Sequence, residues 1–270
     1  MDRHDIPTAV AIGFTISAFS TLGHEAIGHG AACVLTGCVP VQFSSTYFIG
    51  NKVGLSDLAI RTISLGGTLF NLVLGLVFLA LLRMIGPGAP AGRYYVLWFG
   101  SMVNLVSATG YAFFGSAFAF GDFRTILEGA GMPLRVGCIL LGGVLYFGAL
   151  WVVARNADPL LGSGPDRRSR LFALVLLPAV GAGAILSASA LLSPIPEAAI
   201  FLFIGKVFPA IGAWGLLQWF VGDGKGEPAR AIARSRAWWI AAAVVVLAAG
   251  AVGPGVPRAT SAELESRAGE

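Results

Sequence analysis

The sequence predicts an all-α polytopic membrane protein with about seven transmembrane helices. The chain has 270 residues, of which 56% are hydrophobic and only 12% are charged, and its mean hydropathy is +0.79. Such a composition leaves too little polar surface for a soluble domain. Crossing a hydrocarbon core takes about 20 helical residues. Seven apolar stretches satisfy this length, at 7–30, 60–84, 94–118, 133–154, 170–192, 196–220 and 236–253.

The distribution of basic residues predicts the orientation. With seven spans, one side of the membrane holds Arg3, Arg83, Arg93, Arg155, Arg167, Arg168, Arg170, Lys225, Arg230, Arg234 and Arg236. The other side holds Lys52, Arg61, Arg124, Arg135, Arg258 and Arg267. The richer side is expected to be cytoplasmic, and it includes the N-terminus. Topology therefore explains the basic pI, and no patch that interleaves basic and aromatic residues indicates a nucleic-acid partner.

The first stretch is expected to remain in the mature protein, because a polar cluster at Gly23–Gly30 interrupts it and no cleavage site follows. The link from Thr36 to Asp57 differs from the other loops. It contains the β-branched and aromatic run Val39–Phe48, followed by a Gly50-Asn51 turn signal. We expect a short extended or hairpin-like segment there, covered by protein or lining a watery cavity.

Three cysteines are too few for a disulfide framework. We expect Cys138 to be a small apolar residue within a helix, and Cys33 to be structural. The polar end of the chain, 254–270, is expected to be a disordered tail.

The first stretch also carries the residues His24-Glu25-Ala26-Ile27-Gly28-His29. Ionisable groups inside a membrane helix are costly, so this cluster predicts a functional site. Imidazole and carboxylate are ligand types of Zn²⁺, and a catalytic zinc site takes three protein ligands and leaves one position for water. The sequence therefore indicates a candidate zinc site within this His-Glu-His cluster.

The spacing of the two histidines departs from the usual H-E-x-x-H. A separation of five residues places His24 and His29 about 140° apart on a regular α-helix, too far apart to share one ion. A π-bulge near Ala26–Gly28 would absorb the extra residue. The alternative is a different ligand set on the stripe of Glu25, His29 and Cys33, of which only two adjacent members could act together.

A third ligand must come from another segment. Asp122 follows the third stretch and lies on the side that the end of the first helix reaches, which makes it the leading candidate. Glu128 and Asp57 share that side and are weaker alternatives. Two asparagines, Asn71 and Asn104, each follow a small residue by four positions. They are expected either to make interhelical hydrogen bonds or to face a shared polar site.

Taken together, these motifs resemble the site-2 protease family of intramembrane zinc metalloproteases, in particular small members without a PDZ domain. The resemblance covers about residues 15–125 and consists of HEAIGHGAACVLTG, the extended segment, Gly67-Thr68-Leu69-Phe70-Asn71 and Gly121-Asp122. It implies a three-helix metalloprotease-like core at 1–130 and four additional transmembrane helices at 131–253. It also implies His24, His29 and Asp122 as zinc ligands, Glu25 as the catalytic base, and Asn71 and Asn104 as substrate-binding residues.

The resemblance further implies a multi-pass protein of the bacterial inner membrane that hydrolyses peptide bonds in membrane-embedded or membrane-adjacent segments of a protein substrate. Two other functions remain open. One is a catalytically inactive relative that binds metal or a membrane partner. The other is a transporter, suggested by Lys206 in the sixth stretch, which needs a cavity, an interface or a partner such as Glu197.

Overall fold

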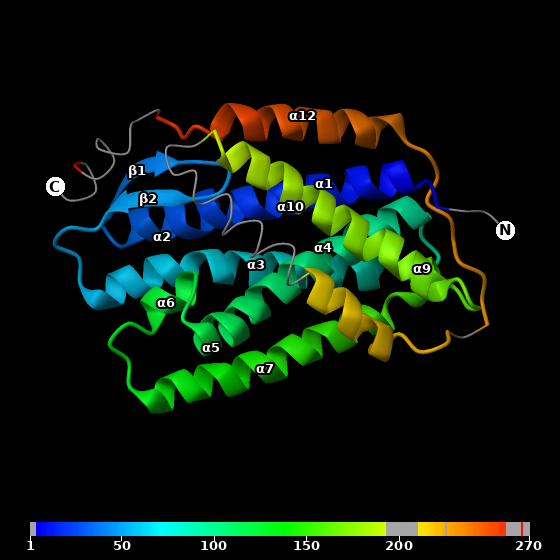
Figure 1. Cartoon of the computed structure of the whole chain (residues 1–270), viewed down its shortest axis with the longest axis horizontal. Coiled ribbons are helices and arrows are strands. Elements are labelled where there is room, and N and C mark those ends of the chain that lie inside the picture. The colour runs from blue at the N-terminus through cyan, green and yellow to red at the C-terminus, as the bar shows by residue number, and fades with distance from the viewer. Residues whose placement is uncertain (1–3, 193–209, 225, 258–265, 267–270) are drawn as a thin grey trace.

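The computed structural model describes residues 4–192, 210–224, 226–257 and 266. Long helices run roughly alongside one another, and a β-hairpin lies at one end of the bundle (Figure 1). The N-terminus lies at the opposite end from this hairpin (Figure 1).

The first helix is continuous but changes its winding. It consists of α1 (Ile6–Gly23), a π-helical turn η1 (His24–His29) and α2 (Gly30–Leu35). Asp5 begins it, because its carboxylate accepts a hydrogen bond from the amide of Thr8 at 3.0 Å. The remaining helices of the described residues are α3 (Asp57–Ile85), α4 (Ala91–Gly110), η2 (Tyr111–Gly115), α5 (Ser116–Phe118), α6 (Asp122–Ile126), α7 (Met132–Arg155), α8 (Asp158–Leu161), α9 (Arg167–Leu171), η3 (Phe172–Leu176), α10 (Leu177–Ala190) and α12 (Arg236–Val252).

Among the described residues, five helices are long and apolar enough to cross a membrane. They are Ile6–Leu35, Asp57–Ile85, Ala91–Phe118, Met132–Arg155 and Arg167–Ala190, and they match the first five predicted stretches. The sixth stretch is described only at 210–220, which is helical, and both Lys206 and Glu197 lie outside the described residues. The seventh, α12, has 17 residues, a length of about 26 Å. The structure thus supports a helical membrane protein with five candidate spans.

The exposed faces of these helices are apolar. Leu140 and Val144 on α7 expose 65% and 72% of their surface, and Ile240 and Leu247 on α12 expose 64% and 74%. A water-facing surface would not carry such stripes on several helices. The pattern fits a protein whose helices face hydrocarbon.

The predicted extended segment is a two-stranded antiparallel sheet. Strand β1 (Val39–Phe43) pairs with β2 (Phe48–Asn51), with Phe43 opposite Phe48 and an irregularity between Pro40 and Gln42. A disulfide between Cys33 and Cys38 joins the end of α2 to the start of β1. The low cysteine count argues only against a framework of several disulfides, and it is compatible with a single local bridge.

The outer edge of β1 is covered by residues 253–257. The amide of Phe43 donates to the carbonyl of Val256 at 3.0 Å, and the amide of Val256 donates to the carbonyl of Phe43 at 2.7 Å. The side chain of Gln42 donates to the carbonyl of Pro257 at 2.7 Å. The tail was expected to be disordered from residue 254, but residues 254–257 are ordered because they satisfy the exposed strand edge.

The two predicted parts of the chain share one hydrophobic core. Its largest buried side chains include Tyr95 and Trp98 from α4 and Tyr146 and Leu150 from α7. The phenol of Tyr95 donates to the carbonyl of Leu174 in η3 at 2.8 Å. Residues 1–130 therefore do not pack as a unit separate from the later helices.

Candidate metal centre

The π-helical turn η1 brings the two histidines of the motif onto one face. A π-turn closes its hydrogen bonds over five residues, which is the separation of His24 and His29. Their ring centroids lie 4.8 Å apart, and the rings are perpendicular. Both residues are buried, with 6% and 8% of their surface exposed. Of the two alternatives left open by the spacing, the structure contains the bulged helix.

Glycines on the facing helix α3 make room for this turn. A Cβ on Gly67 would lie 2.5 Å from Nε2 of His24 and 2.7 Å from Nε2 of His29. A Cβ on Gly28 would lie 2.5 Å from the Cα of Gly67 and 2.9 Å from the carbonyl oxygen of Gly66. These distances are too short for any side chain. The glycines therefore permit the close approach of the backbones that places both imidazoles against α3.

A hydrogen bond orients the second imidazole. Nδ1 of His29 lies 2.8 Å from the carbonyl oxygen of Ile63, one turn before Gly67 on α3. A carbonyl only accepts, so Nδ1 carries the proton, which leaves the lone pair of His29 on Nε2. Metal-binding histidines use this arrangement, with the second nitrogen donating to a backbone carbonyl. The ring of His24 instead stacks on Tyr111 at a centroid distance of 5.7 Å.

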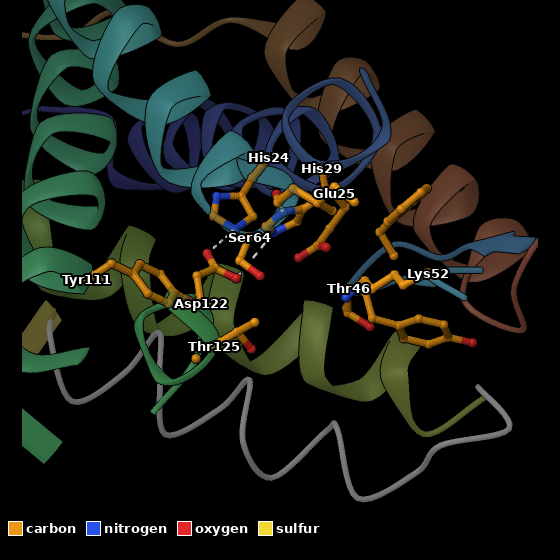
Figure 2. A pocket seen from close by; sticks show the side chains of 13 residues that line it. His24, Glu25, His29, Thr46, Lys52, Ser64, Tyr111, Asp122 and Thr125 are labelled. Carbon is orange, nitrogen blue, oxygen red and sulfur yellow. Dashed lines mark hydrogen bonds and ion pairs between the residues drawn. The ribbon is translucent and has the colours of Figure 1, made fainter. Parts of the chain in front are cut away.

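Asp122 begins α6 and points at both imidazoles (Figure 2). Its Oδ2 lies 3.3 Å from Nε2 of His24, and its Oδ1 lies 3.3 Å from Nε2 of His29. Gly121 precedes it with a φ of 57°, in the left-handed region, and a Cβ there would lie 2.6 Å from the Tyr111 ring. Gly121 thus allows the turn that directs the carboxylate inward.

The spacing of these three side chains suits zinc. Ligand atoms about 2.0–2.1 Å from a tetrahedral zinc lie about 3.3–3.4 Å from one another. The separations of Asp122 from His24 and from His29 have this length. Glu25 forms a second candidate set with the two histidines, in which the ligand atoms are up to 4.8 Å apart. The contacts of Asp122, made through one oxygen to each histidine, have the length of a tetrahedron edge, so Asp122 is a candidate third ligand beside Glu25.

The charge state of Asp122 also fits this role. Burial disfavours its charged form, but hydrogen bonds from Nε2 of the two imidazoles, made when a proton rather than a metal occupies that nitrogen, outweigh burial and lower the pKa of Asp122 below its usual value. The carboxylate is therefore ionised at neutral pH, as a metal ligand must be. Nδ1 of His24 is buried and has no hydrogen-bond partner among the described residues.

A cavity of ≈ 290 Å³ opens beside these residues. Figure 2 shows the carboxylate of Glu25 projecting into it, on the side toward Thr46 and Lys52. The wall opposite η1 comes from the hairpin and α6, and the remaining lining residues include Tyr47, Phe48, Ile63, Ser64, Tyr111 and Thr125. A carboxylate beside these three side chains and facing a polar cavity is positioned to exchange a proton with a reactant.

The other predicted residues lie elsewhere. Asn71 and Asn104 are buried, with 3% and 0% exposure, and neither lines the cavity. Asn104 donates to Oγ of Ser20 on α1 at 2.9 Å, so the interhelical hydrogen bond is observed for this residue. Cys33 forms the disulfide and is not a ligand. Asp57 and Glu128, the weaker candidates for the third ligand, do not line the cavity.

Sequence reasoning missed three features of the site. Lys52 and Tyr111 line the cavity, and neither differed in pattern from other residues of its segment. Gly67 was identified only as a small residue spaced from Asn71, whereas the structure places it directly against both histidines. Comparison of the chain with family models, with curated proteins and with solved structures gave no match.

Proposed function

We propose that the protein is a zinc-dependent peptidase that cleaves membrane-embedded or membrane-adjacent segments of other proteins. The observation that carries this proposal is the convergence of His24, His29 and Asp122 at 3.3 Å spacings, with Glu25 beside them in an open cavity. Three protein ligands and a neighbouring carboxylate are the parts of a hydrolytic zinc site.

In this proposal each residue has a distinct role. His24, His29 and Asp122 hold the metal, and the hydrogen bond to Ile63 keeps Nε2 of His29 available. Bound zinc supplies a Lewis acid that polarises a carbonyl and lowers the pKa of water. Glu25 accepts the proton of the attacking water and delivers it to the leaving amine.

The hairpin is the proposed path of the substrate. Thr46 and Tyr47, at the tip between β1 and β2, line the cavity together with Phe48, the first residue of β2. The outer edge of β1 already pairs with Val256, so a substrate strand cannot add there at Phe43. An extended peptide would instead pass along the tip and present one bond to Glu25. The hydroxyl of Thr46 is buried without a partner among the described residues, and is available to such a peptide.

The disulfide supports an orientation for the site. Disulfides persist in oxidising compartments and are rare in the cytosol. Cys33 and Cys38 lie at the same end of the bundle as the cavity, and the opposite end carries Arg155, Arg167 and Arg170. We therefore propose that the site opens on the side of the membrane away from the cytoplasm, with the basic end inside.

Metal content separates this proposal from its alternatives. Elemental mass spectrometry on detergent-purified protein should find about one zinc per chain, and this zinc should be lost in His24→Ala, His29→Ala and Asp122→Ala. Glu128→Ala removes a carboxylate at the same end, outside the cavity, and should keep the metal. Wild-type protein without zinc after metal-replete purification would overturn the proposal.

Cleavage separates an active enzyme from a metal-binding relative. Incubation with membrane-protein substrates should yield products with wild type and none with Glu25→Gln, while Glu25→Gln still holds zinc. Equal cleavage by both proteins would show that Glu25 is not the catalytic base. Zinc retained by the wild type, with no cleavage of any membrane segment tested, would favour the metal-binding relative instead.

A further inference from the structure

A second cavity lies at the end of the bundle opposite the metal cluster. It has a volume of ≈ 450 Å³, and three segments enclose it. These are the first turns of α1, the N-terminus of α4 with the preceding Pro90, and residues 231–235 with Trp238 of α12. The backbone hydrogen bond from Asp5 to the carbonyl of Ile232, at 2.9 Å, ties two of these segments together.

The charges that line this cavity are all positive. Arg93 and Arg234 contribute to its wall, and no acidic side chain of the described residues does. The guanidinium of Arg234 lies 4.6 Å from the ring centroid of Trp239, and Arg93 makes no hydrogen bond or ion pair within the described part of the chain. Arg234 also interacts electrostatically with Asp5, whose carboxylate caps α1. The cavity therefore presents two cationic groups, of which Arg93 has no anionic partner among the described residues.

The backbone adds donors to the same wall. Pro90 precedes α4 and offers no side-chain cap, so the first amides of α4 have no partner in the helix. Ala91, Gly92 and Arg93 of this first turn all line the cavity. No heavy atom lies within 4 Å of a Cβ placed on Gly92, so the space beside this turn is open. Guanidinium groups and free amides together are a chemistry that suits phosphate.

The location of the cavity favours a lipid as the source of that phosphate. Trp238 and Trp239 lie at the start of α12, and aromatic residues of this kind gather where a membrane meets water. Ile240, Val244 and Leu247 lie on the face of α12 opposite Trp238, and they expose 64%, 57% and 74% of their surfaces. The surface that faces hydrocarbon therefore begins next to this end of α12, which places the cavity at the depth of lipid headgroups.

We propose that this cavity binds the headgroup of an anionic phospholipid of the inner leaflet. In this proposal the phosphate binds to Arg93, Arg234 and the first amides of α4, and the acyl chains extend into the surrounding bilayer. Basic cavities at helix ends on the cytoplasmic side of a membrane bind such headgroups. This site is separate from the metal cluster, and its existence does not depend on the proposed peptidase activity.

Native mass spectrometry of the detergent-purified full chain tests the proposal. We would add phosphatidylglycerol or phosphatidylethanolamine and compare the lipid retained on wild type with that on the double variant Arg93→Gln/Arg234→Gln. Wild type should retain phosphatidylglycerol, and the double variant should bind it about tenfold or more weakly. Arg155→Gln is the matched control, because Arg155 also lies over a tryptophan, Trp151 at 5.2 Å, but outside the cavity.

Two further measurements complete the test. The variant Arg93→Lys/Arg234→Lys keeps both charges and should restore most of the binding, which separates loss of charge from loss of fold. Equal retention of the two lipids by wild type would overturn the proposal, as would unchanged retention by the double variant. If inorganic phosphate displaces phosphatidylglycerol at millimolar concentration, the cavity binds a soluble phosphate, and the proposal of a lipid ligand is wrong.

Discussion

Gly67 lies so close to the imidazole of His24 that any side chain at position 67 would collide with the ring. A Cβ at this position would lie 2.5 Å from Nε2 of His24. The proposed metal site therefore depends on a residue that cannot itself bind a metal.

Replacing Gly67 by Ala is expected to displace both imidazoles and to lower the zinc content well below about one per chain. The helix itself should persist, because alanine favours helix over glycine by about 1 kcal/mol. Elemental mass spectrometry and circular dichroism measure the two quantities. Gly148→Ala on α7, where a Cβ has no heavy atom within 4 Å, is the control and should keep the zinc. Full zinc content in Gly67→Ala would contradict this expectation, because it would show that η1 and α3 can move apart without loss of the metal.

The disulfide is expected to stabilise the hairpin. A Cβ on Gly50 would lie 2.4 Å from Sγ of Cys38, so β2 packs directly on the bridge. Replacing Cys33 and Cys38 by Ser should lower the free energy of unfolding by about 2 kcal/mol, the entropy expected for so short a loop. Thermal unfolding in detergent measures this change, and Cys138→Ser is the control. Three reactive thiols in protein purified without reductant would contradict the bridge.

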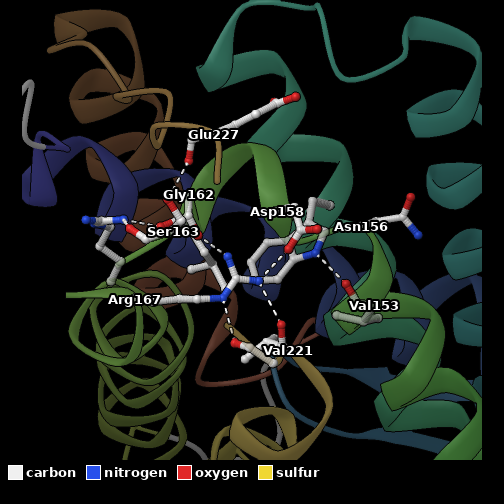
Figure 3. A network of polar contacts seen from close by, with 12 residues as sticks. Val153, Asn156, Asp158, Gly162, Ser163, Arg167, Val221 and Glu227 are labelled. Carbon is white, nitrogen blue, oxygen red and sulfur yellow. Dashed lines mark hydrogen bonds and ion pairs between the residues drawn. The ribbon is translucent and has the colours of Figure 1, made fainter. Parts of the chain in front are cut away.

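A buried arginine is expected to hold the basic end of the bundle together. Arg167 is 3% exposed and donates to the carbonyls of Val221 at 2.9 Å and Gly222 at 3.1 Å, and also to the carbonyl of Gly162 and to Asp158 (Figure 3). Replacing Arg167 by Ala leaves these acceptors unpaired and should cost about 3–5 kcal/mol.

Thermal unfolding measures this cost, and Arg168→Ala is the matched control, since Arg168 is exposed on the same helix. The control should unfold within a few degrees of wild type. Similar unfolding temperatures for both variants would mean that the segment beginning at Val221 docks without the network.

The docking of the N-terminus is expected to weaken in mild acid. Nε2 of His4 lies 2.9 Å from the carbonyl of Leu160, and Nδ1 accepts from the amide of Ile232 at 3.2 Å. Burial lowers the pKa of His4 below 6.5, the hydrogen bond to Leu160 opposes this shift, and the charge of Arg170 adds to it.

The folded state therefore binds the proton less readily than the unfolded state does. Stability should be constant above about pH 7 and should fall as the pH drops below 6.5 toward the lowered pKa of His4. Unfolding temperatures between pH 5 and 8 measure this in wild type and His4→Gln. The unfolding temperature should depend less steeply on pH in His4→Gln than in wild type. The same pH dependence in both proteins would exclude His4 as its cause.

The sequence by itself determined the environment of the chain and the location of its chemistry. Hydropathy over about 20 residues reports the cost of leaving apolar helices in water, so the first five stretches correspond to five candidate spans. The composition of residues 39–48 likewise predicted the hairpin. Ionisable residues are rare in such helices, which singled out His24, Glu25 and His29.

Only the tertiary structure decided how these residues meet. In a regular helix His24 and His29 diverge, and the π-turn that unites them is held by the packing of Gly28 against Gly66 and Gly67. Asp122 comes from a helix nearly a hundred residues later, and its contact with both imidazoles depends on the course of the chain between them. Asn104 bonds to Ser20 rather than facing the cavity for the same reason. Local sequence sets the free energy of each backbone conformation, whereas contacts between distant segments determine which conformation the folded chain adopts.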